Sequence, residues 1–229
     1  MPTDFRSIIY LIIGLLIGMI LHEYMHGRAA DFFGDKTARN AGRLTLNPIP
    51  HIDPFGTVLV PLALLLLSGG HWMFGYAKPV PVNPFFMRKP RRDMVFVSLA
   101  GPVTNFAIAG VVVLIGYIIT VAGVSSGITV GGGKIFGPLT QLFQLLFVVA
   151  EINIILGFFN LIPIPPLDGS HVAEYFMSHE TRVRYERIAP FGFVIILVLL
   201  AVAGSYFFAA MRPIFNVIMS AWGTGLRFV

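Results

Sequence analysis

Long runs without a charged side chain constrain this chain more than any other feature. Residues 95–133 and 188–211 contain no charge at all, and residues 136–161 contain only Glu151. An α-helix rises 1.5 Å per residue, so about 20 apolar residues cross the roughly 30 Å hydrocarbon core of a bilayer. These runs predict an integral membrane protein built from helices, because a helix satisfies its own backbone hydrogen bonds in lipid.

The composition supports this class and excludes others. Of the 229 residues, 56% are hydrophobic and 12% are charged, against roughly 25% charged in a soluble domain. The net charge is +5, but the basic residues cluster in loops beside apolar runs. We therefore expect them to contact lipid headgroups and set topology, and we expect no nucleic acid partner. The absence of cysteine leaves His, Asp and Glu as candidate metal ligands.

We predict an all-α polytopic membrane protein with five to six transmembrane helices, forming a single membrane-embedded domain over residues 1–229. The expected spans are residues 7–33, 94–121, 136–161, 188–211 and a shorter 213–226. Gly14 and Gly18 have a spacing that supports close packing of the first helix against a neighbour.

Three other segments are not expected to be regular spans. Residues 57–67 are apolar but short and contain Pro61, which favours a re-entrant or tilted segment. Residues 75–84 carry prolines that forbid a helix and predict an extended loop. This loop is either an edge that offers its backbone to an unwound substrate or a rigid connection. Residues 171–187 are amphipathic and predict an interfacial helix.

Charge in the loops predicts the orientation. If residues 57–67 do not span, one side of the membrane carries nine basic residues within residues 27–93, and the opposite loop carries only Lys134. Because cytoplasmic loops are the basic ones, residues 27–93 and 171–187 are expected in the cytoplasm. The nine basic residues are Arg28, Lys36, Arg39, Arg43, Lys78, Arg88, Lys89, Arg91 and Arg92.

The motif His22-Glu23-Tyr24-Met25-His26 ends the first apolar run. A helix places residues i and i+4 on one face, so His22 and His26 can bind one metal ion. Glu23 lies about 100° around the helix, where it can reach a water on that metal. This is the H-E-x-x-H arrangement of zinc peptidases, and ionisable residues at membrane depth indicate function.

Two histidines leave a catalytic zinc site incomplete, because such sites use three protein ligands and a water. Asp168 is the preferred third ligand, since it follows a helix broken by prolines while the sequence is still apolar. Glu151 is the alternative. For His51 and Asp53 we favour a loop histidine and a turn aspartate over a role beside the metal. The metal-site core then covers about residues 7–170, and residues 171–229 form C-terminal helices.

Two further motifs are Gly101-Pro102-Val103-Thr104-Asn105 and Phe159-Asn160-Leu161-Ile162-Pro163-Ile164-Pro165-Pro166-Leu167-Asp168-Gly169. With the histidine motif they make the chain resemble the site-2 protease family of intramembrane zinc metalloproteases, from residue 22 to about 169. Residues 47–57 and 77–84 make it similar to a small prokaryotic branch of that family. The chain has no room for the PDZ or CBS domain of many members.

The resemblance implies that His22, His26 and Asp168 bind one Zn²⁺ and that Glu23 is the catalytic base. It implies that Asn105 and Asn160 support the substrate or the transition state. The expected partners are transmembrane protein substrates and the lipid bilayer, in a multi-pass protein of the cell membrane whose site opens toward the cytoplasm. The sequence carries no indication of oligomeric state.

Two other functions compete with proteolysis. A catalytically silent protein of the same fold would bind clients, but it would have no need of Glu23. A metal transporter would carry charged residues along a path through several spans, whereas here they concentrate at one depth.

Overall fold

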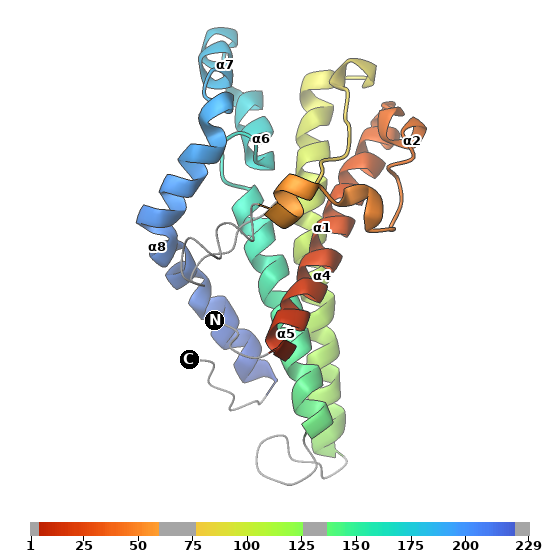
Figure 1. The fold of residues 1–229 in the computed structure, drawn as a ribbon, viewed down its shortest axis with the longest axis vertical. Helices are drawn as coiled ribbons and strands as arrows, with labels where there is room; N and C mark the ends of the chain where they lie inside the picture. The colour runs from red at the N-terminus through yellow and green to blue at the C-terminus, as the bar shows by residue number, and fades with distance from the viewer. Residues whose placement is uncertain (1–4, 60–76, 126–136, 223–229) are drawn as a thin grey trace.

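The computed structural model describes residues 5–59, 77–125 and 137–222, which fold into helices joined by short loops, with no strand among them. Figure 1 shows the long helices side by side and the short ones gathered near one end. The long helices are α1 (Phe5–Phe33), α4 (Pro90–Ser125), α5 (Gly137–Asn160) and α8 (Gly192–Ala221). The short ones are α2 (Thr37–Asn40), η1 (Ile49–His51), η2 (Pro54–Leu59), η3 (Pro84–Phe86), α6 (Asp168–Phe176), α7 (His179–Glu186) and η4 (Ala189–Phe191).

Helices α1, α4 and α5 form the packed centre of the molecule, and glycines let α1 approach α5. A methyl group at Gly14 would lie 2.7 Å from Ile152 Cδ1, and one at Gly18 would lie 2.8 Å from Leu156 Cδ1. The close packing predicted from the Gly14–Gly18 spacing is therefore confirmed, with α5 as the partner.

Four helical stretches among the described residues are long and apolar enough to cross a membrane, and the chain is a multi-pass membrane protein. The prediction of two spans on either side of Pro213 is wrong, because α8 continues through that residue to Ala221. Proline removes one helical hydrogen bond, and apolar sequence on both sides sustains the helix in lipid. Residues 57–59 belong to η2, whereas the rest of the expected re-entrant segment, 60–67, lies outside the described residues.

The far end of α8 is tied to α4 by Trp222, which is 1% exposed. Its indole Nε1–H donates to the Val113 carbonyl at 2.9 Å, and its own carbonyl accepts from Thr120 Oγ1 at 3.1 Å. Phe143 and Phe147 of α5 pack against its ring. This cluster closes the bundle at the end opposite the short helices (Figure 1).

Residues 77–83 have no regular secondary structure, as their prolines predicted. The Lys78 N–H donates to the His51 carbonyl at 2.9 Å, and Arg43 donates to the Lys78 carbonyl at 2.7 Å. At the other end, the Asn83 N–H donates to Asp35 Oδ2 at 2.6 Å. The segment is therefore held at both ends by the chain that follows α1.

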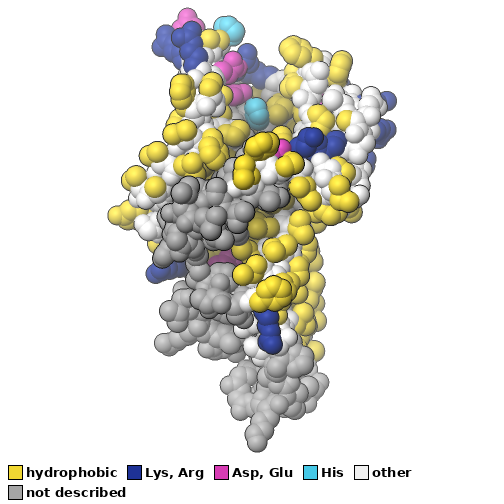
Figure 2. Space-filling view, in the orientation of Figure 1, with side chains coloured by type: hydrophobic (Ala, Val, Ile, Leu, Met, Phe, Trp, Pro, Cys, Tyr) yellow, Lys and Arg dark blue, Asp and Glu magenta, His cyan; other side chains and the backbone are white. Residues whose placement is uncertain are grey.

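The predicted interfacial segment forms α6 and α7, two short helices joined at Met177 and Ser178. Figure 2 shows Lys and Arg side chains gathered at this end of the visible face, while hydrophobic side chains cover the flanks of the long helices. Such a distribution is typical of a bundle whose short helices meet the membrane–water interface.

Candidate metal centre

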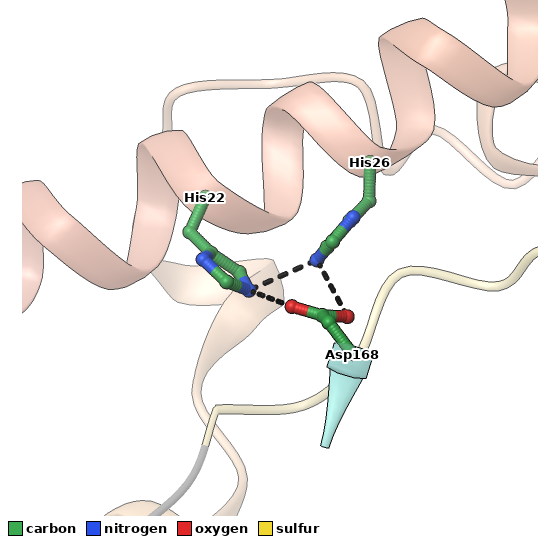
Figure 3. A group of neighbouring side chains, drawn as sticks. All are labelled: His22, His26 and Asp168. Carbon is green, nitrogen blue, oxygen red and sulfur yellow. Dashed lines mark hydrogen bonds and ion pairs between the residues drawn. The ribbon is translucent and has the colours of Figure 1, made fainter. Parts of the chain in front are cut away.

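The structure brings together the three side chains predicted as metal ligands. His22 and His26 extend from α1, and Asp168 is the first residue of α6. The Nε2 atoms of the two histidines lie 2.9 Å apart (Figure 3). Asp168 Oδ2 lies 3.1 Å from His22 Nε2, and Asp168 Oδ1 lies 3.2 Å from His26 Nε2. Among the described residues, only these three form a group with metal-ligand spacing.

A sharp turn of the chain after α5 places Asp168 against the histidines of α1. Helix α5 ends at Asn160, and the proline-rich loop turns back before α6 begins. Gly169 makes this turn possible, because a methyl group there would lie 2.5 Å from the carbonyl carbon of Leu161. The Tyr185 hydroxyl donates to the Pro163 carbonyl at 2.9 Å and links the loop to α7. The helix break therefore aims a carboxylate at the histidines, as the sequence predicted.

The hydrogen bond of His26 fixes its tautomer. Its Nδ1 lies 2.7 Å from the Val97 carbonyl on α4. A carbonyl only accepts, so Nδ1 must carry the proton and donate it. The Nε2 atom of the neutral ring then holds a lone pair, and this is the atom that faces Asp168.

A longer chain of hydrogen bonds fixes the tautomer of His22. The Nδ2 group of Asn105 donates to the Gly18 carbonyl at 3.2 Å and to Asn153 Oδ1 at 2.9 Å. Asn153 Nδ2 donates in turn to the Val149 carbonyl at 2.8 Å. These bonds orient both amides, so Asn105 Oδ1 accepts from His22 Nδ1 at 2.7 Å. His22 Nε2 therefore also carries a lone pair.

The resulting donor set fits a metal cation. With both rings neutral and in these tautomers, two nitrogen lone pairs and a carboxylate converge within 3.2 Å. Asp168 Oδ2 is buried and accepts no hydrogen bond from the described residues. Acceptors so close repel one another unless a cation lies between them. Two imidazoles and one carboxylate are among the ligand sets of catalytic zinc sites, with the fourth position open.

Helix α4 leaves room for this centre at Gly101. A methyl group built there would lie 2.5 Å from His26 Nε2 and 2.6 Å from His22 Nε2. The histidines are almost fully buried, at 7% and 8% exposed. A side chain at position 101 would fill the space in front of the ligand atoms.

Glu23 is half-buried and lies beside the ligands without joining them. Its Oε2 accepts a hydrogen bond of 2.7 Å from the backbone N–H of Val80, in the extended segment. The carboxylate is therefore held between α1 and residues 77–83. A carboxylate next to a metal site, but not ligating it, can act as a general base.

The other residues predicted from the sequence are distributed as follows. Asn160 is half-buried and donates to the Leu156 carbonyl of its own helix at 3.0 Å, so its role in substrate support stays a prediction, as does that of Asn105. His51 is buried and bonds the Thr45 carbonyl at 2.9 Å, and Asp53 accepts from the Gly56 N–H at 2.7 Å. These two bonds agree with the favoured loop and turn roles. Glu151 lies outside the ligand group.

The sequence did not predict the roles that Gly101, Asn153 and the backbone of Val80 have at the site. A usable signal existed for the first, because Gly101 and Asn105 are four residues apart and so share one face of α4. Asn153 also had a signal, as a buried amide at membrane depth needs a partner. No sequence pattern pairs Val80 with Glu23.

Comparison with known proteins agrees with this centre. The chain matches the model of Peptidase family M50 over residues 10–203. It is 39% identical over 198 residues to "Putative zinc metalloprotease YwhC" of Bacillus subtilis (strain 168), covering 86% of this chain and 83% of that protein. No solved structure matches the chain.

Two more distant relatives are named "Putative zinc metalloprotease Rip2". That of Mycolicibacterium smegmatis is 27% identical over 236 residues, covering 99% of this chain and 83% of the relative. That of Mycobacterium tuberculosis (strain ATCC 25618 / H37Rv) is 30% identical over 200 residues, covering 86% and 69%. These names imply zinc and support a protease function, and they confirm the resemblance predicted from the motifs. The chain belongs to peptidase family M50.

Proposed function

We propose that this protein is an intramembrane zinc metalloprotease that hydrolyses peptide bonds in or near the transmembrane segments of membrane protein substrates. The observation that carries the proposal is the convergence of His22, His26 and Asp168 in a multi-pass membrane protein, with Glu23 beside them. A metal site alone would serve a binder or a transporter. The adjacent unligated carboxylate is what a hydrolase requires.

The three metal ligands and Glu23 have different roles in the proposed reaction. A zinc ion held by the three ligands would lower the pKa of a bound water to about 7 and polarise the scissile carbonyl. Because Oε2 of Glu23 is held by Val80, Oε1 is the atom left to accept the proton of the attacking water. Glu23 then returns this proton to the leaving amine nitrogen, so the carboxylate ends the cycle as it began.

The substrate must arrive unwound, because the carbonyls of a membrane helix are already hydrogen-bonded. Residues 77–83 offer an extended backbone next to Glu23. The Val80 carbonyl and both backbone groups of Val82 make no hydrogen bond with the described residues. An extended segment with free N–H and C=O groups can bind a peptide by strand addition, and we assign the capture of the unwound substrate to it.

We propose that the active site opens toward the cytoplasmic side of the membrane. The supporting observation is the basic chain after α1, where Arg39 donates to Asp31 of α1 and Arg43 donates to the Lys78 carbonyl. Basic loops remain in the cytoplasm. Water would reach Glu23 from that side.

The test compares wild type with Glu23→Gln, purified in detergent and assayed against reporters that carry a transmembrane helix. We expect both proteins to hold about one zinc per chain and only the wild type to cleave. A zinc-loaded wild type that cleaves no reporter but retains it would favour the client binder. Zinc flux across liposomes containing either protein would favour the transporter.

A further inference from the structure

We propose that the backbone N–H of Val80 is a positioning group for Glu23, so that the segment assigned to substrate capture also aims the catalytic base. This inference rests on the proposed function. It adds a coupling between two parts of the site that lie 57 residues apart in the sequence. The inference starts from the hydrogen bond between the Val80 N–H and Glu23 Oε2.

The bond is short and well isolated. At 2.7 Å it has the length of a charge-assisted hydrogen bond to a carboxylate. Val80 is 6% exposed, so little water competes for its amide. Both neighbours of Val80 are prolines, Pro79 and Pro81, which have no N–H. No adjacent amide can replace the Val80 donor if the segment shifts by one residue.

Packing against α1 and hydrogen bonds on either side also hold the Val80 amide in place. Gly27 lies one turn after Glu23 on α1, and a methyl group there would lie 3.0 Å from Val80 Cγ1. The missing side chain lets the segment lie directly against α1. The Lys78 and Asn83 amides are bonded on either side of Val80, to the His51 carbonyl and to Asp35. The donor is therefore fixed before any substrate arrives.

A hydrogen bond that orients the Glu23 carboxylate matters because a glutamate has three rotatable side-chain bonds. Freed from Val80, the carboxylate would sample several rotamers, and only some of them aim at the metal centre. Displacing a catalytic group by about 1 Å costs on the order of 10²-fold in rate. Substrate bound at the Val80 carbonyl and Val82 N–H would lie on the same short segment that orients Glu23.

The test removes the Val80 amide hydrogen, together with the valine side chain. Val80→Pro deletes the N–H, and the flanking prolines show that the chain here already accepts an extended conformation. Val82→Pro makes the same change at an amide that has no partner among the described residues and that we assign to substrate. We expect Val80→Pro to lower kcat about 10- to 100-fold with KM within about twofold of wild type. We expect Val82→Pro to raise KM instead.

An unchanged or increased kcat in Val80→Pro, at wild-type zinc content, would overturn the proposal. An increase would mean that Val80 restrains the base and that the bond inhibits the enzyme.

Hydrogen exchange of residues 77–83 provides a second measurement that needs neither cleavage nor a folded proline variant. We expect Glu23→Ala to add one fast-exchanging amide to this segment, because Val80 loses its acceptor. Identical exchange in wild type and Glu23→Ala would overturn the proposal. Increased exchange in Glu23→Ala, together with a zinc-loaded wild type that cleaves no substrate, would keep the contact and refute only the proposed function.

Discussion

Replacing Asn105 with leucine tests how the buried amides support the metal centre. Leucine has a similar size but removes the acceptor of His22 Nδ1–H and the donor to Asn153 and Gly18. His22 could then rotate or change tautomer and present a protonated Nε2 to the metal. The substitution leaves all three ligands in the sequence, so any loss of zinc comes from their orientation.

The magnitude follows from the role of this contact. Removing a hydrogen-bond partner of a metal-bound histidine typically lowers metal affinity 10- to 100-fold, which corresponds to about 1.4–2.7 kcal/mol. Asn153→Leu acts one bond farther away and should cost less. Because both amides belong to one chain of bonds, the double variant should lose less than the sum of the two single losses.

The assay is competition for zinc against a chelator of known affinity, with the purified protein in detergent. Asn160→Leu is the control, since Asn160 is also an amide of a membrane helix, but it is half-buried where Asn105 is fully buried, and it donates to the Leu156 carbonyl of its own helix. We expect its zinc affinity to equal that of wild type. Equal zinc affinity in Asn105→Leu and wild type would refute the tautomer argument, and so would an equal loss in Asn160→Leu.

Two further predictions concern the helix that faces the centre and the orientation of the protein. Gly101→Ala should lower zinc affinity at least about tenfold, measured by the same competition, because its methyl group enters the space at the histidine Nε2 atoms. Gly110→Ala, on the same helix with no atom within 4 Å, should bind zinc normally and raise thermal stability by up to about 1 kcal/mol. Single cysteines at Phe85 and Phe176, 91% and 80% exposed, should both react with an impermeant maleimide from the cytoplasmic face; labelling from opposite faces would disprove the assigned orientation.

The grouping of His22, His26 and Asp168 could be predicted from the sequence because each part of it follows a local rule. Helical periodicity pairs His22 with His26, and the prolines before Asp168 require a break that is tolerated only inside the protein. The extended form of residues 77–83 also follows from local chemistry, since proline fixes the backbone and removes N–H groups. These features need no knowledge of which helices are neighbours.

The support of the site could not be predicted in the same way, because it depends on contacts between distant elements. Asn153 reaches His22 only through Asn105, and it does so because α1, α4 and α5 pack together. Val80 reaches Glu23 only because Gly27 leaves room on α1. The local rule also failed at Pro213, where the apolar surroundings of α8 outweigh the lost hydrogen bond.

The central claim is that Asp168, which follows the break after α5, is the third metal ligand beside His22 and His26. The most direct test measures zinc content and cleavage in Asp168→Asn and in Glu151→Gln, the other carboxyl predicted at membrane depth. We expect Asp168→Asn to lose both zinc and cleavage, and Glu151→Gln to keep both, because Asp168 lies within 3.2 Å of the histidine nitrogens and Glu151 is outside the group with metal-ligand spacing found among the described residues. Full zinc content and wild-type cleavage in Asp168→Asn would contradict the account.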